Sequence, residues 1–201
     1  MSAYALAKFY DILLYPFLNK TRKITARVIQ RLHPESLIDI CCGTGNQLKY
    51  LGHTKIKLTG IDNSPAMLRA AKLFNCYQQD ARSLEFPDQW FDMALIQLAL
   101  HEKRRADQQQ IIHEAFRIIK KNGYLVIFDY HITPKTSMPA RVMVHSIEFL
   151  AGKQHYRYFK EYHKQGGLTT LIDPTRFETI HSIPLAGKTF VLKVYRKIDQ
   201  S

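Results

Sequence analysis

The chain has 201 residues, 46% of them hydrophobic, which suits one folded domain and argues against intrinsic disorder. No apolar run approaches the roughly 20 residues that cross a bilayer, and the N-terminus does not have the pattern of a secretory signal. The formal net charge of +12 favours an anionic partner such as nucleic acid, a membrane surface or an acidic small molecule, but the basic residues are spread along the chain and do not decide among these.

Strands and helices alternate along the first 130 residues. Short apolar runs predict strands at SLIDIC (36–41), KIKLTGID (55–62), NCYQQD (75–80), FDMALIQLAL (91–100) and YLVIFDY (124–130). Apolar residues at helical spacing predict helices over 3–18, 20–32, 45–52, 64–74 and 104–120. Ser64 as an N-cap and Pro65 at the first helical position are a strong start signal, and Asn122-Gly123 is expected to close the last of these helices.

After Tyr130 the alternation stops. Two helices are expected over 137–151 and 155–166, and the segment 176–197 predicts two strands joined by a short turn. The pattern as a whole indicates a single Rossmann-like α/β domain. Its sheet is expected to be doubly wound, mostly parallel and seven-stranded, ending in an antiparallel hairpin.

Three cysteines, Cys41, Cys42 and Cys76, cannot all pair within one chain. Two of them are neighbours, and no CxxC or Cys/His spacing indicates a set of metal ligands. We therefore expect reduced thiols, a cytoplasmic protein and no bound metal.

The most informative segment is LIDICCGTGN (37–46), in which a strand ends in a glycine-rich turn and a helix follows. Gly43 and Gly45 in such a turn let backbone N–H groups approach a ligand closely. Asp62 ends the next strand about 20 residues on, where a carboxylate can accept hydrogen bonds from both ribose hydroxyls. This pair fits nicotinamide dinucleotides and S-adenosylmethionine. Leu48 occupies the third glycine position of the dinucleotide fingerprint, which disfavours a dehydrogenase.

At these residues the sequence resembles the class I S-adenosylmethionine-dependent methyltransferases. The segments that carry the resemblance are DICCGTGNQ, GIDNSPAML, QQDARSLEFPDQWFDMALIQLALHE and EAFRIIKKNGYLVIFDY. Within the family the sequence is most similar to the ubiquinone- and menaquinone-biosynthesis C-methyltransferase group (methyltransferase type 11). The resemblance covers residues 36–130 in register. It implies an N-terminal helical lid over 1–33, a cofactor-binding core over 36–130, a helical insertion over 137–170 and a C-terminal hairpin over 176–197.

The resemblance also implies roles at the cofactor end of the sheet. Asp39 would hold the glycine turn and the methionine amino group, or only cap the turn, while Gly43 and Gly45 would leave backbone room for the methionine moiety. Asp62 would bind the ribose. The other implied cofactor contacts are Asn63 and Met67 beside the adenine, Asp80 and Ala81 at its amino group, and Gln97 and Leu98 over the methyl-bearing sulfonium. Met67 fits a core position equally well. The family usually has a glycine at Cys41, where a small side chain is expected to be tolerated.

The acceptor end carries fewer signals. His101 follows the fourth strand at the carboxyl edge of the sheet, where open α/β sheets bind ligands. It is the candidate base or acceptor contact, against the alternative of a structural or solvated histidine. The other candidate acceptor-binding residues are Tyr10 and Tyr15 on the N-terminal helix, Asp129 and Tyr130 at the end of the fifth strand, and His155 and Tyr156 in the helical insertion. An aromatic helix stripe is more often part of a core than of a site.

We therefore expect a methyltransferase that uses S-adenosylmethionine, without metal, to modify a hydrophobic or aromatic small molecule. A quinone-precursor-like ring is the first candidate and a lipid amine the next. The segment Gln97–Leu100 does not read N/D-P-P-Y, a motif that often grips planar nitrogens, so nucleic acid is a less favoured acceptor. The basic N-terminal helix is expected to make weak contact with anionic membrane surface. The alternatives are an RNA methyltransferase, which the net charge favours, and a cofactor-binding regulatory protein without turnover; the oligomeric state is left open.

Overall fold

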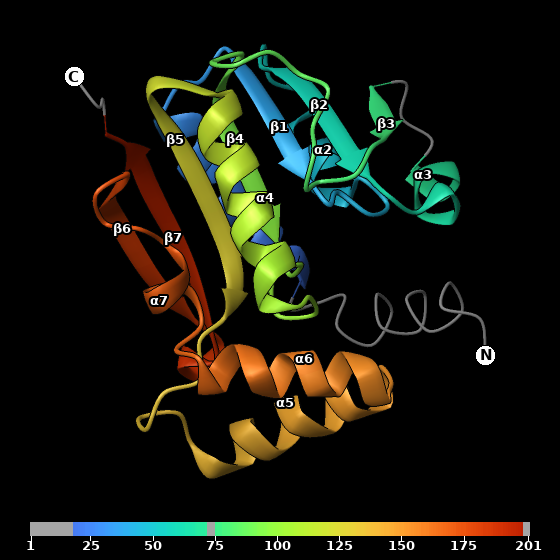
Figure 1. Cartoon of the computed structure of the whole chain (residues 1–201), viewed down its shortest axis with the longest axis vertical. Helices are drawn as coiled ribbons and strands as arrows, with labels where there is room; N and C mark the ends of the chain where they lie inside the picture. The colour runs from blue at the N-terminus through green and yellow to red at the C-terminus, as the bar shows by residue number, and fades with distance from the viewer. Residues whose placement is uncertain (1–17, 72–74, 199–201) are drawn as a thin grey trace.

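The computed structural model describes residues 18–71 and 75–198 (Figure 1). The candidate residues Tyr10 and Tyr15, and nearly all of the helix expected over 3–18, lie outside this range. In the part of the chain that is described, no helix is both long and apolar enough to cross a membrane.

A seven-stranded sheet with the order β3-β2-β1-β4-β5-β7-β6 forms the centre of the described chain. Its strands are β1 (Ser36–Ile40), β2 (Lys57–Asp62), β3 (Cys76–Gln78), β4 (Phe91–Gln97), β5 (Ile119–Tyr130), β6 (Phe177–Leu185) and β7 (Phe190–Lys197). The first five strands are parallel, and β7 lies antiparallel between β5 and β6. The predicted mostly parallel sheet with an antiparallel hairpin is therefore confirmed.

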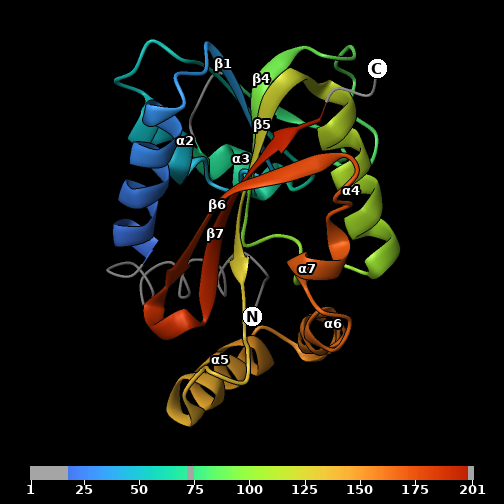
Figure 2. The same cartoon turned by 90° about the vertical axis from the view of Figure 1, so that its left-hand side faces the viewer.

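The central strands are apolar because helices cover both faces of the sheet. The helix over residues 18–31 and the helix α4 (Arg105–Ile118) lie on opposite faces in Figure 2. Between them, β1 and β4 contribute Leu37, Ile38, Met93 and Leu95 to the core, each without measurable exposure. Packing of this kind fixes where the ends of the two strands lie.

The order of the strands reverses between β1 and β4, which are neighbours in the sheet although β2 and β3 lie between them in the chain. Open α/β sheets bind ligands outside the carboxyl ends of the strands at such a reversal. Short helices follow the strands on one side of it, α2 (Asn46–Leu51) after β1 and α3 (Pro65–Ala71) after β2. The topology therefore places a candidate ligand site at the ends of β1, β2 and β4.

The helical insertion consists of α5 (Met138–Leu150), α6 (Lys153–Lys164) and α7 (Leu168–Leu171), and α5 and α6 pack against each other. Two of these helices, α5 and α6, lie beyond the carboxyl end of β5 (Figure 1). Gly166 and Gly167, both with positive φ, follow the end of α6. The hairpin that returns to the sheet turns through a short 3-10 segment, Ala186–Lys188.

Some expected boundaries are wrong, because the strands predicted over 75–80 and 91–100 end at Gln78 and Gln97. The helix predicted over 104–120 ends at Ile118, and Ile119 is already extended and begins β5. Ile119 pairs with Phe91 of β4, and both side chains are buried. Burial of these two side chains in the sheet overrides the helical periodicity, and Asn122-Gly123 forms an irregularity within β5 rather than a helix end.

Gly60 of β2 tests how tightly this edge of the sheet packs. A Cβ at this position would lie 2.7 Å from Cys76 Sγ, 2.8 Å from Leu48 Cδ1 and 2.9 Å from Cys42 Sγ. Gly60→Ala should lower the free energy of unfolding by about 1–3 kcal/mol, the usual cost of overpacking, measured by urea denaturation. The control Gly52→Ala meets only ordinary contacts and should change it by less than about 0.5 kcal/mol. Equal effects of the two substitutions would contradict this account.

Candidate functional site

A turn with three left-handed residues joins β1 to α2. Cys41, Gly43 and Gly45 have φ values of 61°, 55° and 65°. Glycine adopts this conformation freely, whereas a residue with a Cβ is disfavoured by roughly 1–2 kcal/mol. A small side chain at Cys41, expected to be tolerated, therefore carries a backbone cost, because its φ is in the region that favours glycine.

The turn presents an open surface at Gly43. A Cβ built on Gly43 would meet no atom within 4 Å, so the backbone here borders free space. Gly45 is the N-cap of α2 and has no side chain with which to cap it. The N–H groups at the start of α2 therefore also lie at this turn, which is the arrangement that lets a backbone approach a ligand closely.

Asp62 ties this turn to the end of β2. Its Oδ2 accepts a hydrogen bond from Gly43 N at 2.8 Å, and its Oδ1 accepts one from Ser64 N at 2.9 Å. A carboxylate has about four lone-pair sites, so two remain for a ligand. Asp62 thus shapes the turn and can still accept hydrogen bonds from the two hydroxyls of a ribose.

Asp39, in β1, is a buried carboxyl with an exposed fraction of 2%. Burial and the nearby charge of Asp62 raise the pKa of Asp39 to about 8. No described residue donates a hydrogen bond to it, so its charged form has no compensating partner within this part of the chain. A cationic group placed beside Asp39 would supply that partner.

The residues expected around an adenine lie further along the same edge. Asn63 is exposed and Met67 is half-buried, while Ala81 is buried. Asp80 does not end β3, which stops at Gln78, and its carboxylate pairs with the Arg82 guanidinium at 2.6 Å. The Arg82 guanidinium, through hydrogen bonds, lowers the pKa of Asp80. An adenine amino group would have to share this carboxylate with Arg82.

Gln97 and Leu98 stand where β4 ends, and both are half-buried. Leu98 has a φ of 50°, and its N–H donates to Phe128 O at 2.8 Å. A leucine held in the left-handed region marks a sharp turn away from the sheet. This turn carries the chain to His101.

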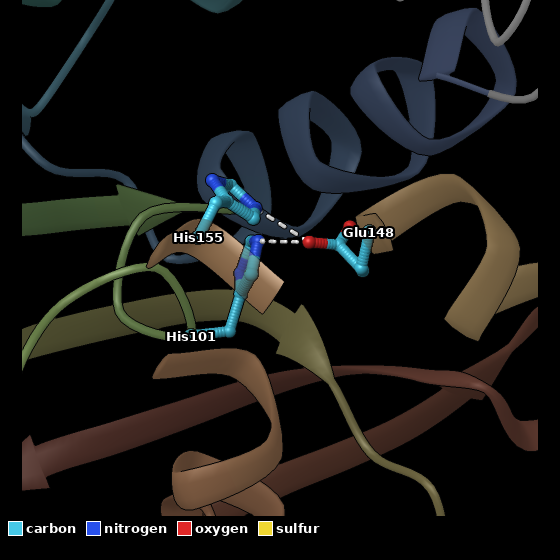
Figure 3. A group of neighbouring side chains, drawn as sticks. All are labelled: His101, Glu148 and His155. Atoms are coloured by element: carbon cyan, nitrogen blue, oxygen red, sulfur yellow. Dashed lines mark hydrogen bonds and ion pairs between the residues drawn. The ribbon is translucent and has the colours of Figure 1, made fainter. Parts of the chain in front are cut away.

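His101 lies in a buried polar cluster at the acceptor end (Figure 3). Its Nδ1 donates to Asp129 Oδ1 at 2.6 Å, and its Nε2 is 3.7 Å from Glu148 Oε2. Glu148 Oε1 accepts from the Tyr130 hydroxyl at 2.6 Å, and Oε2 accepts from His155 Nε2 at 2.5 Å. The cluster joins residues after β4, at the end of β5, on α5 and on α6.

The structure therefore brings together four of the candidates from the acceptor end, His101, Asp129, Tyr130 and His155. Tyr156 is not one of them, because its hydroxyl hydrogen-bonds with His145 Nδ1 at 3.1 Å. Sequence reasoning missed Glu148. It occurs in an apolar helix, where a lone buried carboxylate is the signal that could have identified it.

The charges around His101 affect whether its imidazole can act as the expected base. Burial by itself lowers the pKa of His101, but the Asp129 carboxylate, together with Glu148 and Glu102, raises it to about 9. The imidazole is therefore protonated at neutral pH, and must lose that proton before it can accept another. The base role of His101 remains a prediction.

Glu102 joins Lys103 to the cluster around His101. Lys103 Nζ donates to Glu102 Oε1 at 3.0 Å, and Glu102 Oε2 lies 3.6 Å from His155 Nδ1. Burial raises the pKa of Cys41 to about 12, and the charges of Lys103 and Glu102 also act on that thiol. The charge of Glu102 thus acts both on Cys41 in the glycine turn and on His101.

Residues 38–127 match the family described as a methyltransferase domain. The chain is 31% identical over 134 residues to the demethylmenaquinone methyltransferase of Thermotoga maritima, covering 62% of this chain and 58% of that protein. It is 27% identical over 114 residues to a phosphatidylethanolamine N-methyltransferase of Cereibacter sphaeroides, with coverage of 52% and 55%. The chain thus spans about half the length of the curated relatives it matches.

Solved structures share the fold. An S-adenosylmethionine-dependent methyltransferase of Methanosarcina mazei superposes with a TM-score of 0.64 at 21% identity. The match covers 85% of this chain and 97% of that one. At this level of identity the likeness concerns the arrangement of the elements alone.

The raised pKa of Asp39 predicts how stability depends on pH. Because the pKa is about 8 in the folded chain and 3.8 for an unperturbed aspartate, the stabilising contribution of the protonated form is complete below pH 3.8 and is lost as the pH rises to about 8. Asp39→Asn is neutral throughout, so at about pH 8 it should melt at least 2–4 °C above the wild type, the shift that about 1 kcal/mol gives in a chain of this size. Near pH 4 the two melting temperatures should coincide.

The control for this prediction is Asp62→Asn, measured by the same thermal denaturation. Asp62 accepts two backbone hydrogen bonds, and an amide can accept only through its single oxygen. This variant should melt below the wild type at neutral pH. A stabilised Asp62→Asn, or an Asp39→Asn variant that never exceeds the wild type, would refute the assignment of the unfavourable buried charge to Asp39.

Proposed function

We propose that the chain is a class I S-adenosylmethionine-dependent methyltransferase that transfers a methyl group to a hydrophobic or aromatic small molecule. The observation that supports this most is the pair of carboxylates at the reversal of the sheet, Asp39 and Asp62, on either side of the open turn at Gly43. These groups match the amino acid and ribose portions of S-adenosylmethionine in charge and hydrogen-bonding capacity.

The ammonium group of the cofactor would be the positively charged partner that the buried Asp39 carboxylate lacks in the described part of the chain. A buried carboxylate without a hydrogen-bond donor is unfavourable, whereas beside an ammonium it forms a charge-assisted pair. The energy that the free protein loses by burying Asp39 is thus recovered on binding. Asp62 would accept from the ribose hydroxyls with its two remaining lone-pair sites, and Gly43 would leave room for the chain that joins these two portions.

The transfer itself requires alignment more than acid–base chemistry. A lone pair of the acceptor forms a bond to the methyl carbon while the carbon–sulfur bond breaks and its electron pair stays on sulfur, which becomes a neutral thioether. Any proton on the attacking atom leaves to a base or to water. Alignment and exclusion of water can supply much of the acceleration of such an in-line step.

The acceptor class is proposed from the surroundings of His101. Tyr130 and Phe159 contact its ring edge to face, with centroids 4.7 Å and 6.3 Å away. An aromatic environment of this kind suits a ring or an apolar chain better than a polar metabolite. The relatives named above act on a demethylmenaquinone and on a phosphatidylethanolamine, both lipophilic, which agrees with this choice.

A lipophilic acceptor would be collected from a membrane. The helix α5 exposes an apolar face, made of Met138, Val142, Met143, Phe149 and Leu150. Together with the net charge of +12, this face supports weak contact with an anionic membrane surface. Nearly all of the N-terminal helix first expected to make this contact lies outside the described residues.

Cofactor binding is the first test. Calorimetry should show that S-adenosylhomocysteine binds and that NAD does not. Asp39→Asn should weaken binding by about 1.5–3 kcal/mol, the range for a lost hydrogen bond to a charged group. In the wild type the affinity should rise as the pH approaches 8, because Asp39 must ionise to receive the ammonium, and this rise should be smaller in the variant. The control Asp88→Asn removes an exposed carboxylate and should bind normally.

Two results would contradict the cofactor assignment. One is unchanged affinity in Asp39→Asn across the pH range. The other is loss of affinity in Asp88→Asn to the same degree, which would mean that only the overall charge matters.

The acceptor class requires a transfer assay with labelled S-adenosylmethionine. A demethylated quinol and phosphatidylethanolamine, each in anionic and in neutral vesicles, are compared with an RNA extract. Label should enter a lipophilic acceptor, and faster in anionic vesicles at low salt. Label in RNA alone would overturn the acceptor proposal and favour the RNA methyltransferase, which the net charge also fits.

A further inference from the structure

Three side chains from three separate elements converge in Figure 3. His101 follows β4, Glu148 lies on α5 and His155 lies on α6. One nitrogen of each imidazole and one carboxylate oxygen lie within 4.8 Å of one another. Two imidazoles and a carboxylate are a donor set that binds divalent zinc and iron in proteins.

We propose that His101, Glu148 and His155 form a binding site for a divalent transition-metal ion, with Zn²⁺ as the best match. The ligand atoms would be His101 Nε2, Glu148 Oε2 and His155 Nε2. Glu148 Oε2 lies between the other two, 3.7 Å from the first and 2.5 Å from the second. Atoms that share one tetrahedral zinc lie about 3.3 Å apart, given zinc–ligand bonds of about 2.0–2.1 Å. Shortening the distance from Glu148 Oε2 to His101 Nε2 and lengthening the distance to His155 Nε2 would bring both toward that value.

The surroundings of the two imidazoles support this site independently. A histidine that binds a metal nearly always donates its other ring N–H to a carboxylate or a carbonyl. His101 donates its Nδ1–H to Asp129 Oδ1 at 2.6 Å, and His155 Nδ1 faces Glu102 Oε2 at 3.6 Å. A carboxylate thus accepts a hydrogen bond from the outer nitrogen of His101 and lies at ion-pair distance from the outer nitrogen of His155. A metal would bind the two inner nitrogens, replacing their present contacts with Glu148 by bonds to the ion.

Asp129 is itself held firmly. Its carboxylate accepts from the backbone N–H groups of Leu100, at 3.1 Å, and Tyr130, at 2.7 Å. These bonds fix the carboxylate and so orient the imidazole of His101. A ligand oriented in this way needs little reorganisation when an ion binds.

Charge and access also fit an ion. Asp129 and Glu148 are both buried, and two buried carboxylates require nearby positive charge, of which one protonated imidazole between them supplies only a single unit. A dication would provide it within the cluster. The side chain of His155 is 24% exposed, so the site can be reached from its side, and three protein ligands would leave a fourth position open.

The open position suggests a use that rests on the proposed function. A hydroxyl oxygen of the acceptor would bind the ion and release its proton to water, because coordination lowers the pKa of a bound hydroxyl. The oxygen lone pair would then form the bond to the methyl carbon, and the electron pair of the carbon–sulfur bond would remain on sulfur. His101 would act as a metal ligand in this arrangement and not as the base.

The test is a titration of tag-free, chelator-treated protein with Zn²⁺ alone, followed by calorimetry and by the melting temperature. The wild type should bind one Zn²⁺ per chain and melt at a higher temperature with it. Loss of an outer-shell partner costs about 10–100-fold in metal affinity, so loss of a ligand in His155→Gln or Glu148→Gln should cost more than about 100-fold. The control His145→Gln removes a histidine of α5 that is outside the cluster and should bind Zn²⁺ as the wild type does.

Absence of stoichiometric binding by the wild type, or equal binding by His155→Gln, would overturn the metal site. His155 is partly exposed, so its variant remains informative if the deeply buried Glu148→Gln does not fold. Binding of S-adenosylhomocysteine is measured in the same variants. It should persist without the metal ligands, so failure of the metal site and failure of the proposed function are separate results.

Discussion

The hydrogen bond that Gly43 N donates to the Asp62 carboxylate, 2.8 Å long, joins the turn after β1 to the end of β2. It depends on the left-handed backbone of the turn, which directs the Gly43 N–H toward the neighbouring strand. It also holds Asp62 near Asp39, and the proximity of two carboxylates in a buried position is unfavourable until a cation joins them. Burial therefore keeps Asp39 protonated at neutral pH in the free protein, at the edge where the strand order reverses, and a cationic group bound there would favour its ionised form.

Buried carboxylates that need a positive partner also occur around His101. Asp129, Glu148 and two histidines form a buried cluster that connects the sheet to α5 and α6. These contacts hold α5 and α6 beyond the carboxyl end of β5 (Figure 1). Whether protons or a metal ion balance the two carboxylates decides the chemistry that the cluster can perform, and His101 cannot serve as base and as metal ligand at the same time.

The features that depend on short segments of the chain could be predicted from the sequence. The turn at Gly43 and Gly45, the carboxylate of Asp62 and the strand alternation all lie within short segments, so their spacing reveals them. The end of α4 could not be predicted, because the pairing of Ile119 with Phe91 is a tertiary contact. Glu148 was missed for the same reason, because its partners His101 and Tyr130 come from other elements. From the helix periodicity alone, Glu148 is only a polar residue within an apolar helix. The pairing of Asp80 with Arg82 likewise depends on the folded turn.

The central claim is that Asp39, Gly43 and Asp62 together form the seat of S-adenosylmethionine. A crystal structure of the chain saturated with S-adenosylhomocysteine tests it most directly. The account predicts the ribose hydroxyls within hydrogen-bonding distance of the Asp62 carboxylate, the amino group of the ligand beside Asp39, and the chain between them lying over Gly43. Ligand density away from this turn, or a bound ligand that contacts neither carboxylate, would contradict it.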